Sequence, residues 1–138
     1  MENLFKEEIN KKLKNIVFIE LKEEYQLEDI KLPVGFSLPI KLDYIIEGIK
    51  EKELEEEINL EKIVDAMIYL LGIDSKFKYA EEYKDVLKAL KIDIKNYAMH
   101  KAFVNQEEDP LDSYLYLKGY EEVKGKDADI IFKDANIL

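Results

Sequence analysis

Cysteine, tryptophan and arginine are absent from this chain. Without cysteine it has no disulfide, no thiolate nucleophile and no cysteine metal site. All 21 of its basic residues are lysines, so it lacks the planar guanidinium group that binds phosphate and carboxylate through two parallel hydrogen bonds. His100 is the only histidine, which excludes the two-histidine zinc motif of metalloproteases. These absences exclude several common kinds of catalytic site.

Long apolar runs are also missing. No run approaches the roughly 20 residues that a membrane-spanning helix needs. The first residues are acidic rather than basic, unlike a signal peptide. The absence of cysteine suits a reducing compartment. Together these features predict a cytoplasmic protein with no membrane partner.

The composition that remains is that of an acidic globular domain. Hydrophobic residues make up 47% of the 138 residues, enough for one domain with a sizeable core. Thirty-one acidic residues against 21 basic ones give a formal net charge of −10. A charge of this sign repels phosphate backbones, and no basic cluster offsets it, so a nucleic-acid partner is not expected.

The N-terminal segment, residues 1–38, is predicted to be a helix followed by an extended linker. Apolar residues recur every three or four positions over residues 3–24, which predicts an amphipathic helix. The β-branched run at residues 15–21 leaves a strand as the alternative, but no second run offers a partner strand. The helix is expected to cap the rest of the fold; alternatively, it pairs with a second copy as a homodimer contact.

The linker covers residues 25–38. Pro33 prevents a helix from continuing through it, while Val34, Phe36 and Leu38 alternate along it. This pattern predicts an extended segment packed against the helices, with a functional loop as the alternative.

Helix-start signals recur along the rest of the chain at a spacing of roughly 35 residues, the length of one helix–turn–helix repeat. The three signals are Leu38–Pro39, Ser75–Lys76 and Asp109–Pro110. They predict three antiparallel helical hairpins within residues 39–138. The hairpins would span residues 39–72, 76–107 and 110–138. With the N-terminal segment they would form one all-α domain of about seven helices, stacked as a repeat array.

Local signals predict where several helices begin and end. Asn59 suits an N-cap, and Gly72 suits the end of the very apolar helix between them. Gly125 breaks the last hairpin. Its final helix reaches Leu138 without a terminating residue, as in a fragment of a longer repeat protein or a helix end completed by contacts elsewhere.

Five residues near the C-terminus share a spacing pattern: Tyr114, Leu117, Ala128, Phe132 and Ala135. Over residues 114–135 this pattern resembles the tetratricopeptide repeat (TPR), in which small residues let neighbouring helices approach around one aromatic ring. The chain departs from the family at Lys118, where a small residue is usual, and its glycine falls one place later, at Gly119. The resemblance implies a right-handed array of helical hairpins with a concave peptide-binding face and no catalysis.

Tyrosines are the best candidates for binding residues. The chain has nine, and two pairs are spaced four residues apart on predicted helices: Tyr79 with Tyr83, and Tyr116 with Tyr120. A tyrosine ring offers a large contact area with a polar tip, which suits a protein interface. The alternative is that these rings fill the space between helices.

Residues that would support catalysis are few. A Glu-x-x-His metal pair ending at His100 would need an acid where Tyr97 stands. The acidic run at residues 51–57 places glutamates on one helical face without a histidine, which favours a solvated helix end over a metal site.

The sequence therefore predicts a protein- or peptide-interaction module that is not an enzyme and uses neither cofactor nor metal. Tyrosine and aliphatic anchors with an acidic rim would select a basic or neutral partner. Two alternatives remain. One is an acidic decoy of a nucleic-acid-binding protein, with carboxylates in a row on one face. The other is a carboxylate-dependent metal enzyme, in which three or more acids converge in a pocket.

Overall fold

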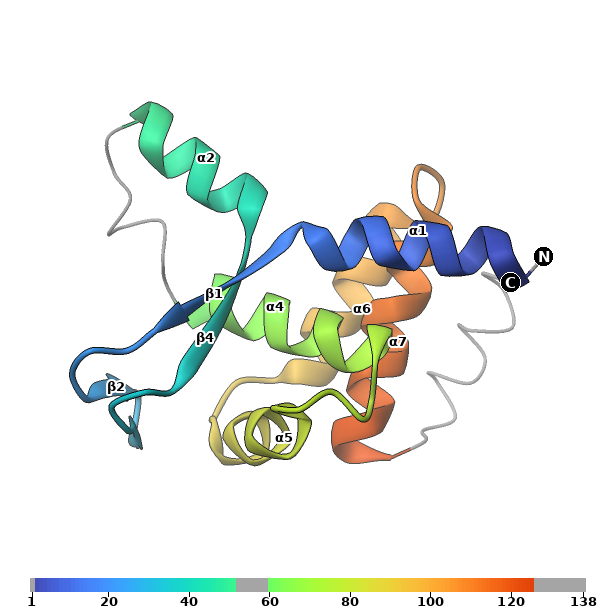
Figure 1. Cartoon of the computed structure of the whole chain (residues 1–138). Coiled ribbons are helices and arrows are strands. Elements are labelled where there is room, and N and C mark those ends of the chain that lie inside the picture. Colours follow the sequence, from blue (N-terminus) through green and yellow to red (C-terminus); the bar gives the residue numbers. More distant parts are fainter. Residues whose placement is uncertain (1, 52–59, 126–138) are drawn as a thin grey trace. The chain divides into compact units, whose positions relative to one another are not determined.

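The computed structural model describes residues 2–51 and 60–125, with side chains described over residues 6–46 and 60–125 (Figure 1). This part of the chain has six helices and four strands. The fold is therefore a mixture of helices and antiparallel strands, and the predicted all-α repeat array is wrong. The chain divides into two compact units, residues 1–66 and residues 67–138.

The first unit contains one helix, four strands, a second helix and the beginning of a third helix, in that order along the chain. Its elements are α1 (Glu2–Lys14), β1 (Ile16–Glu20), β2 (Tyr25–Leu27), β3 (Ile30–Leu32), β4 (Ser37–Lys41), α2 (Leu42–Glu51) and the first residues of α4 (Leu60–Ile73). Figure 1 shows β1 and β4 as the long central pair of this unit.

The N-terminal segment differs from its predicted structure. Since α1 ends at Lys14 and the chain then enters β1, a single helix over residues 3–24 is wrong, and the strand alternative for residues 15–21 is confirmed. The missing partner strand is β4, which contains Pro39, the residue predicted to start the first helical hairpin. That predicted helix start is also wrong, because α2 begins at Leu42.

The four strands form one long antiparallel hairpin. β1 pairs with β4, and β2 pairs with β3. The two ladders have the same register, because equal lengths of chain, residues 21–24 and residues 33–36, separate them on the two sides of the hairpin. Between the ladders, the Leu21 N–H donates a hydrogen bond to the Phe36 carbonyl at 2.9 Å. At the tip, Glu28 has a φ of 52°, a left-handed conformation that two-residue hairpin turns require.

Pro39 is accommodated in β4 by its position in the ladder. It lies opposite Phe18. The Leu42 N–H donates to the Asn15 carbonyl at 2.6 Å, and hydrogen-bonded and non-hydrogen-bonded pairs alternate along an antiparallel ladder. Pro39 is three positions before Leu42, so the alternation places it in a non-hydrogen-bonded pair. The N–H that proline lacks would make no ladder hydrogen bond at this position.

A buried ion pair connects the hairpin to α4 within the first unit. Lys41, the last residue of β4, places its Nζ 3.0 Å from the Asp65 Oδ1. The Asp65 side chain is fully buried and that of Lys41 is only 14% exposed. A carboxylate buried this deeply needs a paired cation to offset its lost hydration.

The second unit consists of helices. After the end of α4, its described elements are α5 (Ala80–Ala89), α6 (Ile94–Asn105) and α7 (Pro110–Lys124). α6 packs along α7, and α5 also contacts α7. Every residue of α4 from Ile63 to Gly72 is buried, and Asp65 is the only charged residue among them.

Capping residues begin two of these helices. The Asp109 side chain accepts a hydrogen bond from the Asp112 N–H at 3.1 Å, with Pro110 in the first turn. α6 begins in the same way after Asp93. The start predicted at Asp109–Pro110 is confirmed, whereas α5 begins at Ala80, later than the Ser75–Lys76 signal indicated.

Two glycines bring the backbones of α4 and α7 into contact. A Cβ placed on Gly72 would lie 2.8 Å from the carbonyl carbon of Leu115, and one placed on Gly119 would lie 2.8 Å from that of Ile68. Both would lie closer still to the carbonyl oxygens. Gly72 of α4 meets Leu115 of α7, and Ile68, four residues earlier in α4, meets Gly119, four residues later in α7. The two helices therefore run in antiparallel directions. Gly72 thus permits a close approach and does not end α4, which continues to Ile73.

Some predicted features lie outside the described residues. They are the N-cap at Asn59, residues 52–57 of the acidic run, and the final helix after Gly125. Gly125 itself ends α7 with a φ of 87°, which confirms the predicted break. No helix in the described ranges combines the length and apolarity needed to cross a membrane.

We expect Lys41→Met to lower the free energy of unfolding by about 3–5 kcal/mol, because it removes the cation beside a buried carboxylate. Urea denaturation followed by circular dichroism measures the change. Lys22→Met is the control, since Lys22 pairs with Glu20 on the surface and its loss should cost under about 1 kcal/mol. Equal effects of the two substitutions would contradict the role given to the buried pair.

Gly119→Ala is expected to lower the free energy of unfolding by about 3 kcal/mol or more, since α4 and α7 must separate to admit the methyl group. The same change in an exposed helix stabilises by about 1 kcal/mol. Gly35→Ala is the control: Gly35 has a φ of 88° but no atom within 4 Å of an added Cβ, so only backbone strain of about 1–2 kcal/mol is expected. A Gly119→Ala protein as stable as wild type would refute the close crossing.

Candidate protein-interaction surface

The four tyrosines predicted to bind a partner are mostly buried. Tyr83 and Tyr116 expose at most 1% of their surface, and Tyr120 exposes 7%. Tyr79 alone is partly exposed. Buried rings contribute to packing, so an interaction surface in this fold has to be sought among other residues.

Tyr79 and Tyr83 belong to one aromatic cluster. Their ring centroids are 6.0 Å apart, and the Phe77 ring lies 5.4 Å from Tyr79 and 6.4 Å from Tyr83. Burial raises the pKa of the Tyr83 hydroxyl above its ordinary value of 10.0, with smaller contributions from Tyr79 and Glu82. The cluster joins the start of α5 to the chain segment that precedes it.

Tyr116 belongs to a second, polar arrangement between α4 and α7. Its ring centroid lies 5.3 Å from that of Tyr69. The Tyr69 hydroxyl donates a 2.5 Å hydrogen bond to the Asp112 carboxylate. At the next residue of α7, the buried Ser113 hydroxyl donates to the Ala102 carbonyl of α6 at 2.6 Å. These bonds satisfy polar groups in the interior of the second unit.

α6 buries only a narrow stripe of its surface. Ile94, Ala98 and Ala102, spaced four residues apart, are its buried residues. The largest apolar side chains near its C-terminal end, Phe103 and Val104, fall on the other side and are 68% and 52% exposed. Phe103 and Val104 are neighbours in sequence, and exposed apolar side chains that lie together are a feature of interaction sites.

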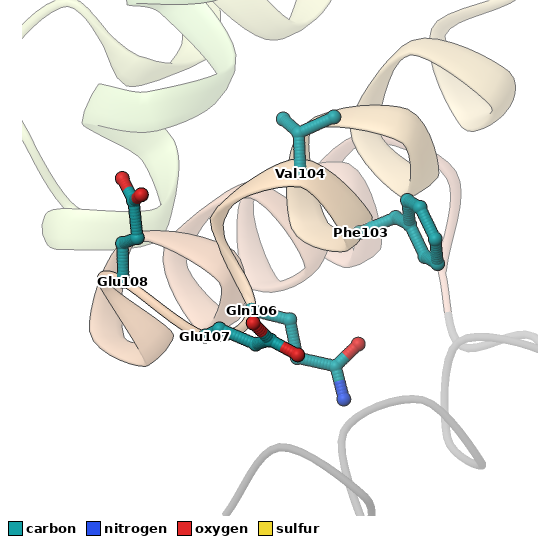
Figure 2. Close-up of a pocket in the computed structure, with 5 residues that line it drawn as sticks. All are labelled: Phe103, Val104, Gln106, Glu107 and Glu108. Atoms are coloured by element: carbon teal, nitrogen blue, oxygen red, sulfur yellow. The ribbon is translucent and has the colours of Figure 1, made fainter.

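The α6-end surface, as we name it, consists of five residues that line one open cavity of about 450 Å³: Phe103, Val104, Gln106, Glu107 and Glu108. Figure 2 shows Gln106 and Glu107 lying together on one side of the ribbon, with Val104 and Glu108 directed to the other side. The volume is within the range of about 300–1,000 Å³ typical of binding pockets.

The charge of this surface is negative. Both Glu107 and Glu108 are exposed, and neither forms an ion pair with any residue that the structure describes. Between Lys101 and Lys118 the sequence contains no basic residue. The nearest lysine of α6, Lys101, places its ammonium group 5.8 Å from the centre of the Tyr97 ring. The α6-end surface therefore combines apolar side chains with carboxylates that form no ion pair with the described part of the chain.

Among the residues that the structure describes, no group of three or more acidic or histidine side chains is placed to hold a metal ion. His100 is exposed on α6, one turn before Phe103 and Val104. The arrangement near α6 offers contact area and charge for binding a partner.

The sequence patterns did not identify the α6-end surface. The signal that could have found it is the spacing of Ile94, Ala98 and Ala102, which already supplies a buried face. Positions 103 and 104 lie more than a quarter-turn from that face at about 100° per residue. A small-residue stripe on one side, with Phe103 and Val104 on the other, indicates an exposed apolar pair.

The raised pKa of Tyr83 predicts a loss of stability at alkaline pH. The unfolded chain ionises this hydroxyl at a lower pH than the folded protein does, so the stabilisation is complete below pH 10 and decreases as the pH rises further. We expect Tyr83→Phe to reduce the loss of unfolding free energy between pH 10 and 11 by about 1 kcal/mol. Urea denaturation at each pH measures it.

The exposed Tyr25 provides the control for this experiment, because Tyr25→Phe makes the same chemical change on the surface. Its pH dependence should follow that of the wild type. If Tyr83→Phe also follows the wild type, the burial of the Tyr83 hydroxyl does not limit alkaline stability.

The resemblance of residues 114–135 to a tetratricopeptide repeat stays a prediction, since positions 128, 132 and 135 of its pattern lie outside the described residues. No family model, curated protein or solved structure matches this chain.

Proposed function

We propose that this protein is a non-catalytic module that binds another protein or a peptide through the α6-end surface. The observation that carries the proposal is the exposure of two adjacent large apolar side chains, Phe103 at 68% and Val104 at 52%, beside a cavity of about 450 Å³. Exposed apolar groups gathered in this way are typical of docking sites.

The two side chains are large enough to anchor a partner. Burying a phenylalanine or valine side chain completely contributes about 1.5–3 kcal/mol each. Interfaces commonly depend on a few such anchors, surrounded by polar groups that exclude water. Gln106, Glu107 and Glu108 are placed to form this polar margin.

A binding role also agrees with the composition. A formal charge of −10 and the absence of cysteine fit a protein that works in the cytoplasm. The interleaving of lysine with glutamate along the chain disfavours an acidic decoy, which would need carboxylates in a row on one face.

The proposal is tested by capturing partners from the native lysate on immobilised protein. We expect Val104→Ser to lose a partner that the wild type retains, because the apolar contact is removed. Val34→Ser is the matched control, because Val34 is a valine of similar exposure, 63%, that belongs to the first unit. Captured proteins are identified by mass spectrometry.

Two outcomes would count against the proposal. One is the same set of captured proteins for the wild type and Val104→Ser. The other is an equal loss with Val34→Ser, which would show nonspecific adsorption to exposed apolar side chains. Circular dichroism spectra of all three proteins should agree, so that loss of binding is not loss of folding.

A further inference from the structure

We propose that the occupant of the α6-end surface is an extended, cationic segment of another protein, in which apolar and basic side chains alternate along one face. This inference rests on the proposed function and specifies the chemistry of the partner. It follows from three properties of the surface. They are the order of its apolar and acidic side chains along the chain, the lack of an ion-pair partner for Glu107 and Glu108 among the described residues, and the hydrogen bonds that hold the other nearby acids.

The first property is a repeated apolar–acidic pair. Phe103 precedes Glu107 by four residues, and Val104 precedes Glu108 by four. Figure 2 shows Val104 and Glu108 directed to one side of the ribbon and Glu107 to the other. Phe103 and Val104 lie in the last turn of α6, and Glu107 and Glu108 lie in the turn that follows its end at Asn105. Each apolar side chain is thus followed by a carboxylate four residues later.

An extended chain can bring one apolar and one basic side chain to the same face. Alternate residues of a strand point the same way and are separated by about 6.6–6.8 Å. A segment with the pattern apolar–x–basic therefore places its apolar side chain against Phe103 or Val104 and its cation near the following glutamate. Acidic or neutral segments lack the second contact.

The second property is that no cation in the described part of the chain pairs with either glutamate. Glu107 and Glu108 have no ion-pair partner among the described residues, and the sequence has no basic residue from position 102 to position 117. A partner that brings lysine or arginine supplies the missing counter-charge. The overall charge of −10 adds a field that draws such a segment towards the protein.

The third property is that the acids next to this pair of glutamates are held by hydrogen bonds at the start of α7. The Asp109 side chain accepts the Asp112 N–H at the start of α7, and the Asp112 carboxylate accepts the Tyr69 hydroxyl. Both aspartates hold the helix start in place. Glu107 and Glu108 are both exposed at the cavity and are directed towards solvent.

Titration of the ¹⁵N-labelled full chain with synthetic peptides tests the inference. The probe is a peptide repeating leucine–serine–lysine–serine, and two comparison peptides carry glutamine or glutamate in place of lysine. The lysine peptide should shift the backbone amides of residues 100–109 most strongly. The glutamine peptide should bind there several-fold more weakly, the glutamate peptide should not bind, and added salt should weaken the lysine peptide.

Two double substitutions separate a site from attraction by net charge. Glu107→Gln with Glu108→Gln should weaken the lysine peptide about 3-fold or more, the effect of two exposed ion pairs. Glu23→Gln with Glu24→Gln removes the same charge from another exposed adjacent pair and should leave the affinity at residues 100–109 unchanged. Val104→Ser should weaken both the lysine and the glutamine peptides.

The outcomes distinguish this inference from the proposed function. If the lysine and glutamine peptides bind residues 100–109 with equal affinity, and Val104→Ser weakens both, the cationic preference is refuted while the docking surface stands. If the two double substitutions weaken binding equally, the peptide responds to net charge and the inference fails. If no peptide shifts these amides, or Val104→Ser changes nothing, both the inference and the proposed binding surface are refuted.

Discussion

The backbone contact between α4 and α7 at Gly72 and Gly119 is the constraint on which the second unit depends. Because protein interiors are close-packed, helices that approach this closely bring their remaining side chains within hydrogen-bonding reach. The Tyr69 hydroxyl thereby meets the Asp112 carboxylate across the crossing. On the other side of α7, Ser113 bonds the α6 backbone, so the same helix is fixed against two neighbours.

The exposed apolar pair follows from how α6 joins this arrangement. Its buried stripe depends on Ala98 and Ala102, which let α7 approach but offer little area themselves. Large side chains at Phe103 and Val104 lie off that stripe and remain exposed. Packing thus uses the small residues of α6 and leaves the large ones available for a partner, next to carboxylates that no lysine in the surrounding sequence neutralises.

Local signals in the sequence predicted part of this fold correctly and failed where structure depends on distant residues. The starts of α6 and α7 were predictable because Asp93 and Asp109 cap amide groups only three residues away. The β1–β4 ladder was not, because its partners are more than fifteen residues apart and Pro39 is a strong local signal against a strand. The strand accepts Pro39 only because of the ladder position that this residue occupies.

The candidate site shows the same division. By itself the sequence determined an acidic chain without cysteine or arginine, several helix ends and an abundance of tyrosine, because composition and capping act over a few residues. Only the tertiary structure decided that Tyr83 and Tyr116 are buried and that Phe103 and Val104 are exposed. The physical reason is that burial depends on which faces neighbouring helices cover, and the glycine crossing and the alanine stripe determine that coverage through contacts between residues distant in the chain.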